Sequence, residues 1–226
     1  MMKIETAIKN GRANLSEYES KLFLSSYGIP VTKEILIKDH GRIVSAAREI
    51  GYPLVLKGCG HDILHKTEKD LVKMDIRNDD EAKAAFHAIT SNMEGTEKNI
   101  LVQEMIQGRR ELVAGMTRDP QFGPCVMFGI GGIFTEIFED VCFRVAPLTR
   151  EDAFALMQGI RGNKILGAVR GMPAVDMEAL AEILIAVGQI GIEHDRVKEI
   201  DLNPIKVPKG SPVAVDALIV LDNTKS

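Results

Sequence analysis

Residues 197–221 have the sequence VKEIDLNPIKVPKGSPVAVDALIVL, in which two apolar runs flank a segment rich in Pro, Lys and Gly. Two such runs joined by a short turn predict an antiparallel hairpin. Because side chains alternate along a strand, the apolar Ile200 and Leu202 are expected on one face. Three oxygen-bearing side chains are then expected on the opposite face: Glu199, Asp201 and Asn203.

The returning strand carries Asp216 inside the otherwise apolar run VAVDALIVL. A carboxylate is costly to bury there unless a cation or strong donors meet it. A tight turn would bring Asp216 within one or two pairing positions of Asn203, and carboxylate and amide oxygens suit Mg²⁺. Alternatively, Asp216 is hydrogen-bonded at a strand end and Asn203 caps the turn before Pro204. The spacing alone leaves both interpretations open.

The rest of the chain mixes helical and extended patterns. Helices are expected over these segments: 16–28, 43–50, 79–93, a segment opening at Thr149, and 177–191. Strands are expected over these: 31–37, 54–56, 71–76, 100–105 and 111–117. The two types do not alternate regularly, which favours α+β lobes over one doubly wound sheet. The polar segment 91–99 contains Gly95, so the predicted lobes are residues 1–95 and 96–226.

The composition is that of a soluble globular chain. The 226 residues are 45% hydrophobic and 27% charged, enough to bury a sizeable core. The net charge of −4 argues against nucleic acid or an anionic membrane as partner, because both require a basic surface.

No run approaches the roughly 18 apolar residues of a membrane span, and the first residues lack a secretory signal's apolar core. Cys59, Cys125 and Cys142 form no CxxC pair, which favours buried thiols in a reducing compartment; a cytoplasmic location is expected.

Two positions near residue 60 are candidates for phosphate chemistry. Lys57 follows the apolar run 54–56, so it would offer a cation to phosphate oxygens if it pointed into a cleft. An exposed lysine at a strand end is the more common outcome. His61 and His65 have the spacing of two zinc ligands on a helix, but no helical pattern or third ligand accompanies them. A lone imidazole in a loop would instead be a nucleophile or proton carrier.

The tract Gly129-Ile-Gly131-Gly132 has neither the dinucleotide-binding spacing nor the P-loop sequence. It would expose backbone N–H groups as an anion nest, or form a plain turn. The charged residues that follow, Glu136 to Arg144, are expected on a solvated face.

The end of the strand predicted over 100–105 carries Gln103 and Glu104, and Glu111 follows Gly108. These side chains are candidates to hydrogen-bond a base and a ribose. Such polar contacts are as often structural.

Five segments together resemble the ATP-grasp β subunit of ADP-forming acyl-CoA (acetyl-CoA) synthetases, relatives of succinyl-CoA synthetase. The segments are GYPLVLK (51–57), DILHKTE (62–68), LVQEMIQG (101–108), TRDPQFGPCVMFGIGGIFTEIFEDVCFRVAPLTRED (117–152) and KEIDLNPIKV (198–207). The central block is long and unusual, and the resemblance extends from Leu15 to Leu221. It implies an ATP-grasp fold, in which two α+β lobes hold a nucleotide.

The resemblance also implies roles for individual residues. ATP or ADP and Mg²⁺ are the implied cofactors, and Lys57 matches the lysine that meets the phosphates. The hinge that contacts adenine corresponds to Gln103, Glu104 and Met105. The metal-binding positions correspond to Asn203 and Asp216, with Asp201 where close relatives carry another acidic residue.

The implied chemistry is phosphoryl transfer through a phosphohistidine. His65 matches a histidine that carries the phosphoryl group, and the loop presented to that group corresponds to Gly131, Gly132 and Glu136. A CoA-binding α subunit is the implied partner, in a hetero-oligomer expected to be α2β2. The alternatives are another ATP-grasp carboxylate ligase, which would not need His65, and a non-catalytic nucleotide-sensing module.

Overall fold

The computed structural model describes residues 4–60, 69–93, 98–132 and 140–223. The chain forms two compact units. One contains a four-stranded sheet and consists of residues 16–18 and 32–106; the other contains a six-stranded sheet and consists of residues 1–15, 19–31 and 107–226. His61, His65 and Glu136 lie outside the described residues.

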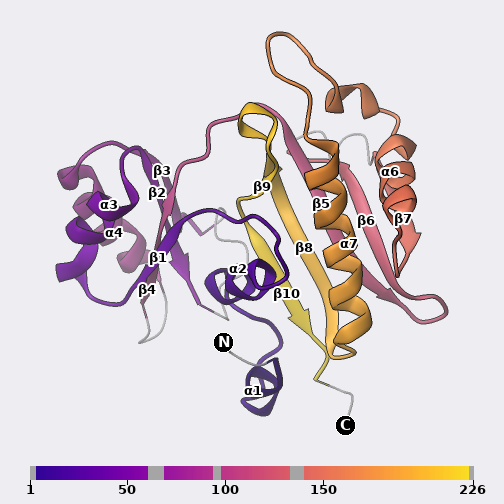
Figure 1. Cartoon of the computed structure of the whole chain (residues 1–226). Coiled ribbons are helices and arrows are strands. Elements are labelled where there is room, and N and C mark those ends of the chain that lie inside the picture. The colour runs from indigo at the N-terminus through magenta and orange to yellow at the C-terminus, as the bar shows by residue number, and fades with distance from the viewer. Residues whose placement is uncertain (1–3, 61–68, 94–97, 133–139, 224–226) are drawn as a thin grey trace. The chain divides into compact units, whose positions relative to one another are not determined.

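The four-stranded unit is an antiparallel sheet with two helices packed against it (Figure 1). Its strands, in spatial order, are β1 (Glu34–Ile37), β4 (Asn99–Glu104), β2 (Leu54–Cys59) and β3 (Val72–Ile76). The helices are α3 (Ile43–Ile50) and α4 (Asp79–Asn92), and a short 3₁₀ turn, His40–Arg42, precedes α3. The helix ends follow their sequence signals. Gly51, with φ of 93°, ends α3, and Asn78 accepts a hydrogen bond from the Glu81 amide at the start of α4.

Alternation along β2 and β4 gives this sheet two different faces. Leu54 and Leu56 on β2, with Ile100 and Val102 on β4, form one core cluster with residues of α3 and α4. The residues between them, including Lys57 and Gln103, therefore lie on the face opposite the two helices.

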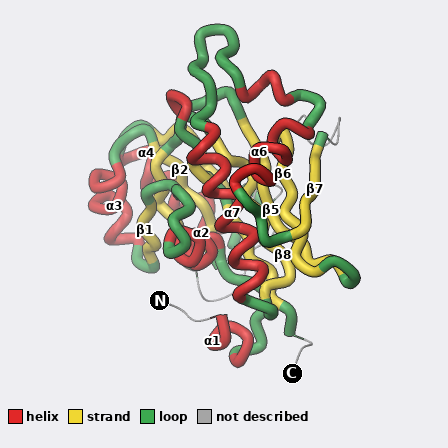
Figure 2. The backbone as a smooth tube through the Cα atoms, turned by 45° about the vertical axis from the view of Figure 1, so that its right-hand side comes forward, coloured by secondary structure: helices red, strands yellow, loops and turns green. Residues whose placement is uncertain are grey.

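The six-stranded unit is also antiparallel, and α6 and α7 cover one face of its sheet (Figure 2). The path through the sheet is β10 (Ala217–Leu221), β8 (Val197–Lys206), β5 (Glu111–Asp119), β6 (Gly123–Ile130) and β7 (Val141–Val145), and β9 (Val213–Ala214) also pairs with β8. The helices are α1 (Ile4–Lys9), α2 (Glu17–Ser25), α6 (Arg150–Gly159) and α7 (Met177–Glu193), with 3₁₀ turns at Asn163–Leu166 and Pro208–Gly210. The first residues of α2 belong to the four-stranded unit.

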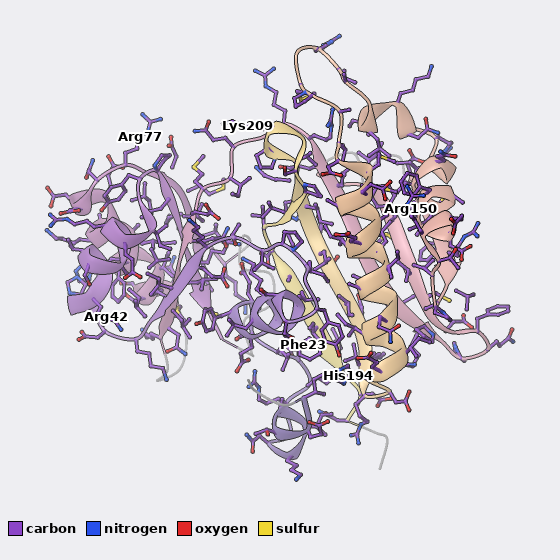
Figure 3. All side chains as sticks on the ribbon, in the orientation of Figure 1. Phe23, Arg42, Arg77, Arg150, His194 and Lys209 are labelled. Atoms are coloured by element: carbon purple, nitrogen blue, oxygen red, sulfur yellow. The ribbon has the colours of Figure 1, made fainter. Side chains whose placement is uncertain are left out.

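Local signals explain the helices of this unit. Thr149 and Asp152 form the predicted capping box at the start of α6. The Asp176 side chain accepts a hydrogen bond from the Ala179 amide and begins α7. At the other end of α7, the His194 ring contacts Phe23 of α2 edge to face, with 5.2 Å between ring centroids (Figure 3). Among the described helices even α7, with 17 residues, is too short to cross a membrane.

The strand predicted over 100–105 was wrongly assigned to the second lobe. It is β4, which lies between β1 and β2 in the four-stranded sheet. The predicted lobes 1–95 and 96–226 would separate β4 from both of its partners, whereas the compact units divide after Ile106. The polar segment 91–99 only connects α4 to the next strand of the same sheet, and sequence spacing does not report which strands pair.

Two strands were missed in the Gly-rich region. Gly129 is not in an anion nest or a turn, because it lies in β6 and pairs with Val113 and Val141. The segment predicted as a solvated charged face ends in β7. A Cβ at Gly129 would come within 2.7 Å of the Asp140 backbone oxygen, so glycine here permits close strand approach.

The cysteine prediction holds in the structure. Cys59 and Cys125 are buried, and Cys142 is partly buried.

Candidate functional site

Lys57 is the first of the predicted phosphate ligands, and it is not an exposed strand-end lysine. It lies within β2, which continues to Cys59, and it is 5% exposed. Its Nζ donates to Oε1 of Glu17 at 2.6 Å, and the two side chains are 7% and 3% exposed. A buried ammonium group is costly without a counter-charge, so Glu17 compensates the burial of Lys57.

The predicted adenine hinge lies at the end of β4. Gln103 is opposite Val55 in the sheet register, is 1% exposed and shares with Lys57 the face opposite α3 and α4. The Glu104 carboxylate accepts a hydrogen bond from the Lys33 amide at 2.7 Å, so this side chain has the structural role that the sequence left open. Met105 is the first residue beyond the strand.

Glu111, Gly131 and Gly132 come together in the six-stranded unit. The Gly131 amide donates to the backbone oxygen of Glu111 at 2.8 Å, and the Glu111 carboxylate is 3.3 Å from Nζ of Lys206. A Cβ at Gly132, where φ is +72°, would be 2.7 Å from Oε2 of Glu111. Both glycines are therefore sites where a side chain would collide with β5 or its carboxylate.

The terminal hairpin has the predicted faces and proximity. Ile200 and Leu202 are buried in the core with α7, and Asn203 on the opposite face is exposed. Leu202 pairs with Ala217, so the next position of the register sets Asp216 across from Asn203. One oxygen of Asp216 accepts a hydrogen bond from the Ala217 amide at 2.8 Å. That contact matches the structural alternative.

Asp201 shows that this face accumulates negative charge. Burial, followed by the charges of Glu199 and Asp216, raises the pKa of the Asp201 carboxyl from its usual 3.8 to about 6. A divalent cation would relieve that repulsion, and two carboxylates with one amide oxygen suit Mg²⁺, which completes its shell with water and phosphate. No group of three His, Cys, Asp or Glu in the described ranges is placed to hold a metal. A cation here would thus depend on Asn203 and on oxygens from outside the chain.

Two residues near these positions were missed by sequence reasoning. One is Glu17, which meets Lys57 across 40 residues of chain. Arg110, next to Glu111, is buried and donates to backbone oxygens of Gly167 at 2.8 Å and Pro173 at 3.0 Å. Burial lowers the pKa of this guanidinium. No local pattern marks either residue, because both contacts are long-range.

Comparisons with known proteins identify the family of the chain. A family model described as the ATP-grasp domain matches residues 6–221. The chain is 43% identical over 212 residues to the β subunit of ADP-forming acetate–CoA ligase I of Pyrococcus furiosus, covering 92% of this chain and 91% of that relative. It is 39% identical over 203 residues to ADP-forming acetate–CoA ligase I of Archaeoglobus fulgidus, covering 88% of this chain but 30% of that longer relative.

A solved structure is similar over almost the whole length. It is an acetyl-coenzyme A synthetase 1 of Ca. Korarchaeum cryptofilum in complex with coenzyme A and Mg-AMPPCP, with a phosphohistidine segment pointing towards the nucleotide-binding site. The TM-score is 0.86 at 42% identity, covering 97% of this chain and 98% of that one. With its mixed helices and antiparallel sheets, the chain belongs to the ATP-grasp family, among the β subunits of ADP-forming acetate–CoA ligases.

Proposed function

We propose that this chain is the nucleotide-binding, phosphoryl-transferring subunit of an ADP-forming acyl-CoA synthetase. The overall reaction is acyl-CoA + ADP + phosphate giving carboxylate + CoA + ATP, and it is reversible. The observation that carries the proposal is the cluster of Asp201, Asn203 and Asp216 on one hairpin, where the pKa of Asp201 is raised to about 6. Such a cluster is unfavourable without a cation and suited to one that also binds phosphate.

The nucleotide-binding roles of individual residues rest on the family resemblance. Lys57 would meet phosphate oxygens as a cation, and Gln103 with Met105 would contact the adenine ring. Asp201, Asn203 and Asp216 would hold Mg²⁺, which when bound neutralises charge on the phosphate oxygens. Asp201 must lose its proton before its carboxylate can bind Mg²⁺. Glu111 would lie at the Gly131–Gly132 loop, where its carboxylate is already fixed near Lys206.

The phosphoryl step would use His65 as a transient carrier. In the ATP-forming direction a terminal phosphate oxygen of ADP attacks the phosphoryl group on the His65 ring. The P–N bond breaks, the P–O bond of ATP forms, and the imidazole recovers its lone pair. Gly131, Gly132 and Glu136 would receive the phosphorylated loop. These roles of His65 and Glu136 rest on the family resemblance.

A partner subunit is required for turnover. The β-subunit relative and the longer Archaeoglobus relative, of which this chain matches 30%, support a partner that supplies the remaining domains. We expect that partner to be the CoA-binding α subunit, in an α2β2 assembly in the cytoplasm.

The experiment is phosphoryl exchange with the co-purified partner, comparing the wild-type chain with His65→Ala. Labelled phosphate should pass from ATP to an acid-labile phosphohistidine in the wild type and not in His65→Ala, while both bind ADP. Unchanged exchange in the variant would remove His65 from the mechanism. ATP hydrolysis by this chain alone, dependent on a carboxylate and an amine, would instead favour a different ATP-grasp ligase. Nucleotide binding without any labelled protein would favour a sensing module.

A further inference from the structure

We propose that Glu17 is a positioning residue for Lys57 and thereby sets the affinity for the nucleotide phosphates. This inference rests on the proposed function, in which Lys57 is a phosphate ligand. Glu17 has no role in the mechanism described so far. It is the first residue of α2, whereas the side chain it contacts lies in β2.

The geometry identifies the contact as a buried ion pair. Oε1 of Glu17 accepts from Nζ of Lys57 at 2.6 Å, and both side chains are almost fully excluded from solvent. Both residues belong to the four-stranded unit. Glu17 also stands in the first turn of α2, where the helix dipole favours a negative charge.

Other ion pairs of this unit are more exposed to solvent. Arg77 and Asp75 are 2.7 Å apart with side chains 70% and 46% exposed, and in the Arg48–Asp79 pair the side chains are 69% and 27% exposed. Exposed pairs of this kind contribute little, because solvent screens them and side-chain entropy opposes them. The Lys57–Glu17 pair is desolvated, so each partner strongly constrains the other.

That constraint has a consequence for phosphate binding. A lysine side chain has four rotatable bonds, and holding its ammonium group charged and in place in a buried setting needs a fixed counter-charge. Without Glu17 the ammonium group would lose this ion pair, and part of the nucleotide's binding energy would be spent on placing the ammonium group again. If Glu17 acted only through its negative charge, removing that charge would have the opposite effect, because Lys57 would then attract phosphate more strongly. The sign of the effect therefore separates positioning from simple charge repulsion.

The test is a double-mutant cycle on MgADP affinity, measured by calorimetry on the full chain. Glu17→Gln should weaken MgADP binding about tenfold, equivalent to about 1.4 kcal/mol. In a Lys57→Met background the same substitution should change the Kd less than about twofold, because the ammonium group that Glu17 positions is gone. Asp75→Asn makes the same change of charge in an exposed pair and should leave the Kd unchanged.

Several results would overturn the inference. Equal weakening in both backgrounds would mean that Glu17 acts on the fold and not through Lys57, and unchanged or tighter binding by Glu17→Gln would contradict positioning. A normal Kd for Lys57→Met would overturn both the phosphate role of Lys57 and this inference, whereas a weakened Lys57→Met with a normal Glu17→Gln would overturn the inference alone. If thermal melts show that Glu17→Gln is unfolded, Glu17→Asp keeps the charge on a shorter arm and enters the same cycle.

Discussion

Replacing Asp201 with Asn should stabilise the cation-free protein at neutral pH. Folding raises the pKa of this carboxyl from 3.8 to about 6, so between these values the folded state keeps a proton that the unfolded state has lost. Stability must therefore fall as the pH rises through this window, and it stays lower above pH 6. The difference between 3.8 and about 6 corresponds to about 3 kcal/mol. Asn has the same shape, carries no charge and would donate to the neighbouring carboxylates.

Urea unfolding in EDTA, followed by circular dichroism at about pH 4, 6 and 8, measures this difference. Asp201→Asn should exceed the wild type by about 3 kcal/mol at the highest pH and match it at the lowest. Glu182→Gln, at an exposed position of α7, changes the charge equally and should stay within about 0.5 kcal/mol of the wild type at each pH. A gap between Asp201→Asn and the wild type that does not change with pH would refute the reasoning, since the cost of ionising this buried carboxyl is its whole basis.

Three further substitutions test the scaffold that holds the site. Thr149→Ala removes the capping box with Asp152 and should lower stability by about 1 kcal/mol, seen as a lower urea midpoint. Gly115→Ala puts a Cβ 2.5 Å from the Ile200 backbone oxygen and should cost about 2 kcal/mol or more; an unchanged melting temperature would contradict the close approach. Arg110→Met removes two hydrogen bonds to loop carbonyls, so we expect a loss of about 2 to 4 kcal/mol and faster proteolysis of residues 163–175. Cleavage at the wild-type rate would show that the loop is held by other contacts.

Helices and the terminal hairpin were predictable because their signals are local. The α4 helix and the α6 capping box lie where the sequence predicts them, and β8 alternates between core and polar faces. A turn of a few residues also fixes which positions of a hairpin meet, so the neighbourhood of Asn203 and Asp216 followed from spacing.

Strand pairing over longer distances was not predictable. The β4 strand was assigned to the wrong lobe, although its own limits were nearly correct, because no local pattern states which strands are its neighbours. The β6 strand was missed because glycine is depleted in strands and favours turns, whereas here it permits close approach to the Asp140 backbone.

The amino-acid order alone specified the helices, the faces of the hairpin, the acidic metal candidates and, through resemblance, the family. The folded chain was needed to show that Lys57 is buried against Glu17, that Glu111 adjoins Gly132, and that burial raises the pKa of Asp201. The reason is physical. Backbone periodicity and capping depend on residues a few positions apart, whereas desolvation and ion pairing depend on which distant segments the sheets bring together.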